Sequence, residues 1–126
     1  MTAFSNAKGV TFVYTRDRAA AKTFYANILG LKLISDDEAS CDFALAGAQL
    51  SLVSIADHSP TAHPVLSFDL SDATAAAQEL AGKGVELTIY PGFGQDDLGI
   101  WTSPDGTRKL GWFNDPDGNC LMLSQS

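Results

Sequence analysis

Basic residues, cysteines and long apolar runs are all scarce in this chain of 126 residues. Eight Lys and Arg stand against fifteen Asp and Glu, so neither nucleic acid nor an anionic membrane surface is an expected partner. The two cysteines, Cys41 and Cys120, are too few for a disulfide framework. No stretch approaches the roughly 20 apolar residues of a membrane span. The N-terminal residues show no secretory signal, and we therefore expect a cytoplasmic protein.

The composition indicates a packed globular domain. Apolar residues make up 45% of the chain and charged residues 18%. A disordered chain would combine low hydrophobicity with high charge, which is the opposite balance. The length fits a single domain, residues 1–126, that can bury a core without disulfides or structural metals.

A pattern of strand, helix, glycine and strand occurs twice along the chain. Residues 10–17 and 65–72 are β-rich runs that end at an aspartate and lead into Ala-rich helix patterns at 19–29 and 73–83. The two aspartates suit the N-cap position, because their carboxylates accept from the exposed amides of the first helical turn. The glycines that follow the helices suit the left-handed residue at a helix end. These four residues are Asp17, Asp72, Gly30 and Gly84.

Further β-rich segments complete two βαβββ modules and predict an α+β fold. In the first copy they lie at residues 31–34, 43–46 and 49–55, and in the second at 85–90, 109–114 and 120–124. The first module spans about residues 8–56 and the second about 64–125. The Pro-containing linker between them is about 57–63.

Alternation along the strands assigns side chains to two sheet faces. In the run 65–72, Leu66, Phe68 and Leu70 share the face that packs on helices. The opposite faces carry a mixture of polar and apolar side chains, which favours a sheet that lines a ligand cavity. The alternative is an ordinary solvated face. The candidate ligand-binding residues on these faces are Phe12, Tyr14, Asp42, Ser51, Ser67, Asp69 and Met122.

Residues 90–101 form a long stretch rich in aromatic side chains. Compact domains rarely keep a loop of this length without a function for it. Its aromatics, with one from the next strand, are candidates for stacking on a planar ligand, and the alternative is that they pack the core or a dimer interface. The four are Tyr90, Phe93, Trp101 and Trp112.

Two aspartates on the predicted cavity side make the candidate site negatively charged. With aromatic neighbours, the carboxylates of Asp42 and Asp69 suit a cationic or amine-bearing ring. If both were buried and close together, one would have a raised pKa and could serve as a general acid or base.

The chain resembles the vicinal oxygen chelate superfamily, which includes glyoxalase I, extradiol dioxygenases and bleomycin-resistance proteins. The resemblance covers about residues 8–125 and implies that the two modules pair into an open β-barrel that encloses a cavity. It also implies a homodimer. The motifs that carry it are Phe24-Tyr25, Leu29-Gly30-Leu31, Asp72 with its helix and Gly84, and Trp112-Phe113-Asn114-Asp115-Pro116-Asp117-Gly118-Asn119.

The enzymes of that superfamily hold a divalent metal at four strand positions with His, Gln and Glu ligands. Carried over, these positions fall on Val10, Ser51, Val65 and Met122. None of the four is a good ligand for such a cation, which needs carboxylate, imidazole or thiolate donors. We therefore expect no metal and no other cofactor, and no Lewis-acid chemistry of the glyoxalase or dioxygenase kind.

Three functions are consistent with these residues. The first is metal-independent, bleomycin-resistance-like binding or sequestration of a small, partly aromatic molecule, with a cationic ligand as one version. The second is a glyoxalase-like lyase or isomerase that moves protons with Asp69, Asp42 or Tyr14. The third is a structural dimer without a cavity. No residue is assigned as catalytic or metal-binding, and the expected partners are the small molecule and a second copy of the chain.

Overall fold

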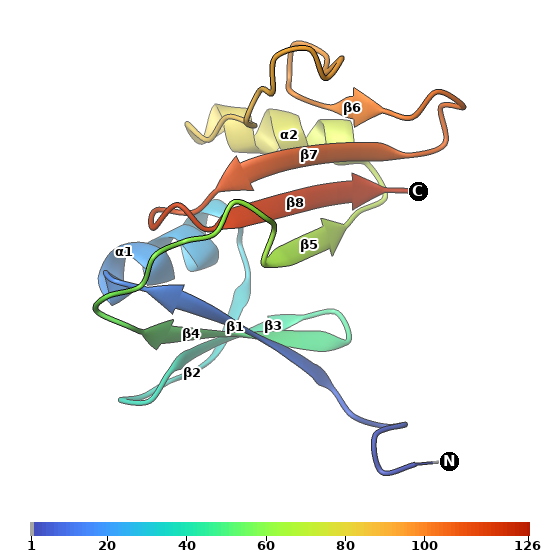
Figure 1. The fold of residues 1–126 in the computed structure, drawn as a ribbon. Helices are drawn as coiled ribbons and strands as arrows, with labels where there is room; N and C mark the ends of the chain where they lie inside the picture. The colour runs from blue at the N-terminus through green and yellow to red at the C-terminus, as the bar shows by residue number, and fades with distance from the viewer. Residues whose placement is uncertain (1) are drawn as a thin grey trace. The chain divides into compact units, whose positions relative to one another are not determined.

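The computed structural model describes residues 2–126 and divides the chain into two compact units, Met1–Ser59 and Pro60–Ser126. Each unit combines helix with one four-stranded mixed sheet, so the α+β class is confirmed (Figure 1). The division falls within the segment 57–63 that the sequence predicts as a linker. None of the helices in residues 2–126 is long and apolar enough to cross a membrane.

The sheet of the first unit has the order β1-β4-β3-β2, with β1 parallel to β4 and the other neighbours antiparallel. Along β1 the side chains of Val13 and Thr15 are buried, while those of Phe12 and Tyr14 are exposed, as the alternation predicts. The strand bounds are β1 (Gly9–Thr15), β2 (Lys32–Asp36), β3 (Cys41–Leu45) and β4 (Ala48–Ser54).

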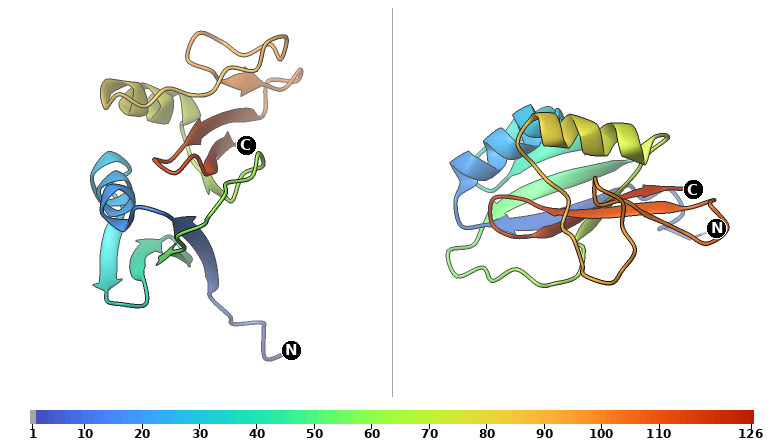
Figure 2. Two further views of the ribbon diagram at one scale, coloured as in Figure 1. Left: turned by 60° about the vertical axis from the view of Figure 1, so that its left-hand side comes forward. Right: turned by 90° about the horizontal axis from the view of Figure 1, so that it is seen from above.

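The helix predicted at residues 19–29 forms in two parts. The first is α1 (Arg18–Thr23), whose N-cap Asp17 accepts a hydrogen bond from the Ala20 amide at 3.2 Å. The helix then widens into the π-helical η1 (Phe24–Ile28), and Figure 2 shows the two as one continuous coil. The wider turn lets the adjacent rings of Phe24 and Tyr25 both enter the core, with centroids 5.2 Å apart.

The sheet of the second unit has the order β5-β8-β7-β6, again with its first and last strands along the chain parallel. The helix α2 packs against β7 and β8, and Asp72 caps it by accepting from the Ala75 amide at 3.0 Å. The sheet face beneath it buries Phe113, Leu121 and Leu123. The elements are β5 (Leu66–Asp69), α2 (Ala73–Gly82), β6 (Trp101–Thr102), β7 (Lys109–Asn114) and β8 (Cys120–Gln125).

The strand predicted at residues 85–90 does not form, and this prediction is wrong. The segment attaches to the sheet through side-chain packing, because Leu87 fills the space above Gly111, where an added Cβ would lie 2.7 Å from Leu87 Cδ1. The Thr88 amide donates to the Trp112 carbonyl at 2.7 Å, but no strand pairing extends from it. The fourth strand of this sheet is instead the short β6, so the order βαβββ is retained.

Both modules are thus present, each with an open sheet. Their closure into a barrel that encloses a cavity concerns how the units pair, and it stays a prediction.

Candidate functional site

On the first sheet, the face opposite to buried Val13 carries four of the predicted site residues. The strand register places Phe12 opposite Ser51 and Ser51 opposite Asp42, so the three lie in one line across β1, β4 and β3. Tyr14 follows along β1, and its ring meets that of His58 edge-on, with centroids 5.8 Å apart. Phe12 is 59% exposed and Ser51 only 5%, so the line runs from an exposed ring to a buried hydroxyl.

The Asp42 carboxylate is surrounded by serine hydroxyls. Ser51 donates a short hydrogen bond to it, Ser40 donates at 2.9 Å and Ser35 at 3.0 Å. These bonds, with that from Ser51 the strongest, lower the pKa of Asp42 below its ordinary value because they favour the charged form. The shift is opposite to the raised pKa that the acid–base alternative requires of Asp42. The group is a fixed anion, which suits attraction of a cation better than uptake of a proton.

In the second unit, the four predicted aromatic residues lie together. Phe93 is at the centre, with ring centroids 5.6 Å from Trp112, 6.0 Å from Trp101 and 6.3 Å from Tyr90. Tyr90 and Trp112 are also in contact, edge-on at 5.6 Å. We call Tyr90, Phe93, Trp101 and Trp112 the aromatic cluster. Tyr90 and Phe93 remain 41% and 46% exposed, so the cluster offers ring surface to a ligand.

Gln95 holds the loop that carries half of this cluster, and sequence reasoning missed it. Its side-chain amide accepts from the Tyr90 amide at 2.7 Å and donates to the carbonyls of Thr88 and Gly99, both at 2.8 Å. Three backbone groups that a strand partner would otherwise satisfy are thus satisfied by one side chain. A single glutamine in a loop has no periodicity or motif around it, so no signal in the sequence could have found this role.

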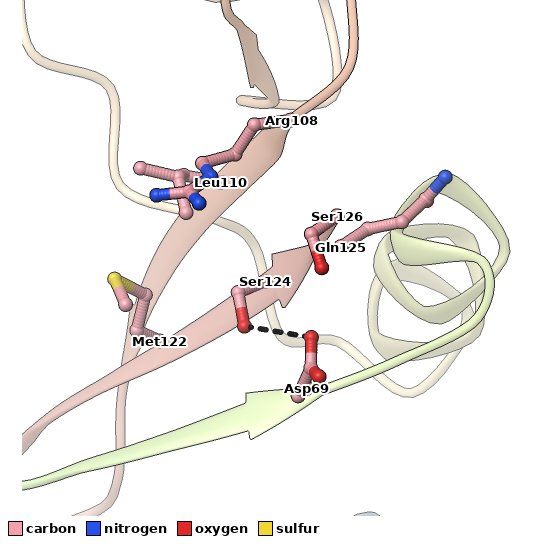
Figure 3. Close-up of a pocket in the computed structure, with 7 residues that line it drawn as sticks. All are labelled: Asp69, Arg108, Leu110, Met122, Ser124, Gln125 and Ser126. Carbon is pink, nitrogen blue, oxygen red and sulfur yellow. Dashed lines mark hydrogen bonds between the residues drawn. The ribbon is translucent and has the colours of Figure 1, made fainter.

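A hollow of about 270 Å³ lies on this sheet (Figure 3), and its lining residues Leu110 and Met122 are the strand neighbours of Trp101 and Trp112. The register aligns Asp69 with Ser124, Leu110 and Trp101 in one line across the sheet. It aligns Ser67, Met122 and Trp112 in the next line. The lining residues of the hollow are Asp69, Arg108, Leu110, Met122, Ser124, Gln125 and Ser126.

Hydrogen bonds among the serines fix the polar end of this hollow. The Ser124 hydroxyl lies 3.3 Å from Asp69 Oδ1 and 3.4 Å from the Ser67 hydroxyl. Of the predicted residues, Met122 is the strand neighbour of Trp112, while Ser67 and Asp69 lie further along the same sheet face. Asp42 and Asp69 belong to different units, and their proximity stays a prediction. Arg108 is a lining residue that the sequence analysis did not select, although the strand alternation places it on the same face as Leu110 and Trp112.

The four positions that correspond to metal ligands do not fit a divalent cation. Val10 and Val65 end in hydrocarbon, and the thioether of Met122 is a neutral, soft donor. Ser51 uses its hydroxyl to donate to Asp42. In the described residues, no three side chains of His, Cys, Asp or Glu gather closely enough to hold a metal ion.

The fold and these faces define a two-module α+β protein with the layout of the glyoxalase class. The family model of the Glyoxalase/Bleomycin resistance protein/Dioxygenase superfamily matches residues 9–123. The chain belongs to this superfamily, as the sequence motifs predict. No curated protein matches the sequence significantly.

Several solved structures share the fold at low sequence identity. Lactoylglutathione lyase from Agrobacterium tumefaciens superposes with a TM-score of 0.71 at 18% identity, over 95% of this chain and 93% of that one. A fosfomycin resistance protein from Listeria monocytogenes superposes with a TM-score of 0.74 at 15% sequence identity, over 95% of this chain and 93% of that one. A glyoxalase/dioxygenase from Nostoc punctiforme superposes with a TM-score of 0.71 at 18% identity, over 100% of this chain and 95% of that one. Enzymes and a resistance protein thus use one fold, and the residues of the site must decide between them.

Proposed function

We propose that this protein binds or sequesters a small, partly aromatic molecule that carries a positive charge, without a metal ion. The observation that carries the proposal is the aromatic cluster beside the hollow of about 270 Å³ on the second sheet. The exposed faces of such rings can stack on a planar ligand, and the negative faces attract a cation. Asp69 at the hollow supplies a carboxylate to pair with it.

The residues at the four metal-equivalent positions support a reaction-free role. A Lewis acid is needed to stabilise the charged intermediates of glyoxalase-type chemistry. Two hydrocarbon side chains, a thioether and a hydrogen-bonded hydroxyl leave no donor set for one. The first sheet supports binding of a cation in another way, since its carboxylate at Asp42 is held in the charged form.

The experiment that tests this proposal compares two amines, one with an aromatic ring and one with a saturated ring. Benzylamine and cyclohexylmethylamine have the same charge and similar size, and each is titrated while fluorescence of the two tryptophans, both in the aromatic cluster, is recorded. We expect benzylamine to bind measurably more tightly. Equal binding of both amines, or of neither, would contradict the proposal. The variant W112L should abolish the preference, and elemental analysis of protein incubated with zinc, nickel, iron or manganese should find no stoichiometric metal.

The alternative function is a glyoxalase-like lyase or isomerase that uses acid–base side chains. The observation in its favour is Asp69, a carboxylate that lines the hollow and is oriented by the Ser124 hydroxyl at 3.3 Å. Its test is breakdown of lactoylglutathione by the wild type and by D69N. Turnover that D69N abolishes would establish the alternative, and absence of turnover in the wild type would remove it for this substrate.

We also propose that the protein acts as a homodimer in the cytoplasm. The exposed apolar side chains of Val10, Phe12 and Tyr14 on one sheet face support a surface that a second copy covers. The free thiols of Cys41 and Cys120 support a reducing compartment. Sedimentation equilibrium should give twice the chain mass of 13.3 kDa for the wild type. The variant F12E should shift the protein towards the monomer mass of 13.3 kDa.

A further inference from the structure

The hollow shown in Figure 3 is lined by charges of both signs. We propose that its ligand is amphoteric: an aromatic molecule whose ammonium group is bound by Asp69 and whose carboxylate is bound by Arg108. This inference rests on the proposed function, because it takes the hollow and the aromatic cluster as the binding surface. What it adds is the charge pattern of the ligand, which a simple aromatic cation does not match.

Arg108 is the basic side chain of the second unit that is available to an anion. Residues 60–126 contain three basic residues, Lys83, Arg108 and Lys109. Lys83 faces Glu79 at 3.8 Å, and Lys109 donates to the Thr102 hydroxyl at 3.1 Å. Within residues 60–126 the Arg108 guanidinium makes no ion pair or side-chain hydrogen bond. In a chain with a net charge of -7, an anionic group needs such a local cation to bind.

Asp69 supplies the opposite charge across the same hollow. Its Oδ1 lies 3.3 Å from the Ser124 hydroxyl, and its Oδ2 takes part in no hydrogen bond within residues 60–126. Asp69 and Arg108 do not pair with each other, so each charge remains available to a ligand. A cavity that holds an unpaired carboxylate and an unpaired guanidinium is complementary to a molecule with both an amine and an acid group.

The strand register gives the spacing of the two charges. Asp69 lies two strands away from Leu110, and Arg108 comes two residues before Leu110 along the chain. Standard sheet spacings put the two Cα atoms about 12 Å apart, a gap that the long, flexible arginine side chain can reach across towards a ligand held at Asp69.

The floor between the charges is apolar and leads to the rings. Leu110 lies between Asp69 and Arg108, and Met122 lines the hollow on the side towards Trp112. Trp101 lies opposite Leu110, and Trp112 lies opposite Met122, so the aromatic cluster begins where the floor ends. A ligand with its charged groups over this floor can place a ring on the cluster.

The experiment uses three phenyl probes that share a ring and differ in charge: L-phenylalanine, phenethylamine and 3-phenylpropanoate. Each is titrated into the full chain and into R108Q, D69N and K109Q while tryptophan fluorescence is recorded. K109Q is the matched control, because it removes the same charge one residue away. Thermal unfolding of each variant verifies that the fold is retained, which is expected because Asp69 and Arg108 are exposed and Lys109 is half-buried.

We expect wild-type protein to bind phenylalanine about tenfold more tightly than either singly charged probe, since each charged hydrogen bond adds to affinity. R108Q should weaken the binding of phenylalanine and of phenylpropanoate by a similar factor, and it should leave the binding of phenethylamine unchanged. D69N should weaken the binding of phenylalanine and of phenethylamine, and it should leave the binding of phenylpropanoate unchanged. If phenethylamine binds but R108Q behaves like K109Q with all three probes, the amphoteric ligand is wrong while the aromatic binding function stands. If no probe binds the wild type, both are wrong.

Discussion

Ser51 of β4 lies directly opposite Asp42 of β3, and its hydroxyl donates to the Asp42 carboxylate. In the superfamily's metal enzymes the position of Ser51 corresponds to a glutamate ligand, so this face keeps a carboxylate but carries it one strand further from β1. There the Asp42 carboxylate accepts hydrogen bonds from the hydroxyls of Ser35, Ser40 and Ser51. The Asp42 carboxylate thus finds its hydrogen-bond partners within this sheet.

Removal of the Asp42 charge should lower stability in a pH-dependent way. Hydrogen bonds lower the folded-state pKa of Asp42 below 3.8, so its contribution is present above the unfolded-state pKa and is lost as pH falls through the folded value. We expect D42N to lower the free energy of unfolding by about 1 kcal/mol at pH 7, and by progressively less as the pH falls below 3.8. Urea unfolding over a series of pH values measures this, with the exposed D57N as control. Equal behaviour of D42N and D57N would contradict the assigned network.

Local signals in the sequence predicted most of the fold. The strand at 109–114 was predicted to the residue, and both N-caps, Asp17 and Asp72, accept the amides that the pattern assigns to them. Gly30 and Gly84 have positive φ angles of 70° and 83°, as their place after a helix predicts. These features depend on a few neighbouring residues, so the sequence contains what is needed to find them.

Features that depend on distant contacts were not predictable. The alternation of Val85, Leu87 and Ile89 favours a strand, but it reflects the packing of Leu87 over Gly111 from a separate part of the chain. Likewise, the aromatic residues of the site could be selected by type, whereas the loop that positions them depends on Gln95. Arg108 was missed because a lone arginine after a turn is usually an ordinary solvated residue.

A methyl group at Gly99 should be far more destabilising than one at Gly92. Both residues have positive φ angles, 96° and 82°, which alanine adopts at a cost of about 1 kcal/mol. An added Cβ at Gly99 would also lie 2.6 Å from Leu87 Cβ, while Gly92 has nothing within 4 Å. We expect G99A to be less stable than G92A by about 2 kcal/mol because of this overlap. Guanidinium unfolding followed by circular dichroism measures the difference, and equal stabilities would show that the loop packs differently.

Both cysteines should react slowly with thiol reagents. Cys41 and Cys120 are buried, and burial raises the pKa of each thiol, so that less of the reactive thiolate is present near pH 8. We expect labelling by Ellman's reagent in native protein to be at least about tenfold slower than in urea, because reaction requires opening of the core. C41S and C120S assign each phase, and labelling of native protein at the denatured rate would disprove the burial of that residue.

Loss of the Gln95 amide should loosen the aromatic loop without unfolding the sheet. Q95M keeps the length of the side chain but removes the bonds to the Tyr90 amide and to the Thr88 and Gly99 carbonyls. Each backbone group that lacks a hydrogen-bond partner and is kept from water costs about 1 kcal/mol or more of free energy. In Q95M the loop can avoid this cost by moving into solvent, where water satisfies these groups. Amide hydrogen exchange should then be at least about tenfold faster across residues 88–100, and unchanged in β7 and β8.

The same variant separates positioning of the rings from their presence. Q95M retains all four aromatics, so weaker benzylamine binding with an altered tryptophan spectrum would mean that the cluster must be held in place to bind. The exposed glutamine of α2 provides the control Q78M, which should leave both exchange and binding unchanged. If Q95M binds benzylamine as the wild type does while its loop exchanges faster, the ligand contacts Trp101 and Trp112 on the sheet and does not need Tyr90 or Phe93. Unchanged exchange would show that the packing of Leu87 alone holds the loop.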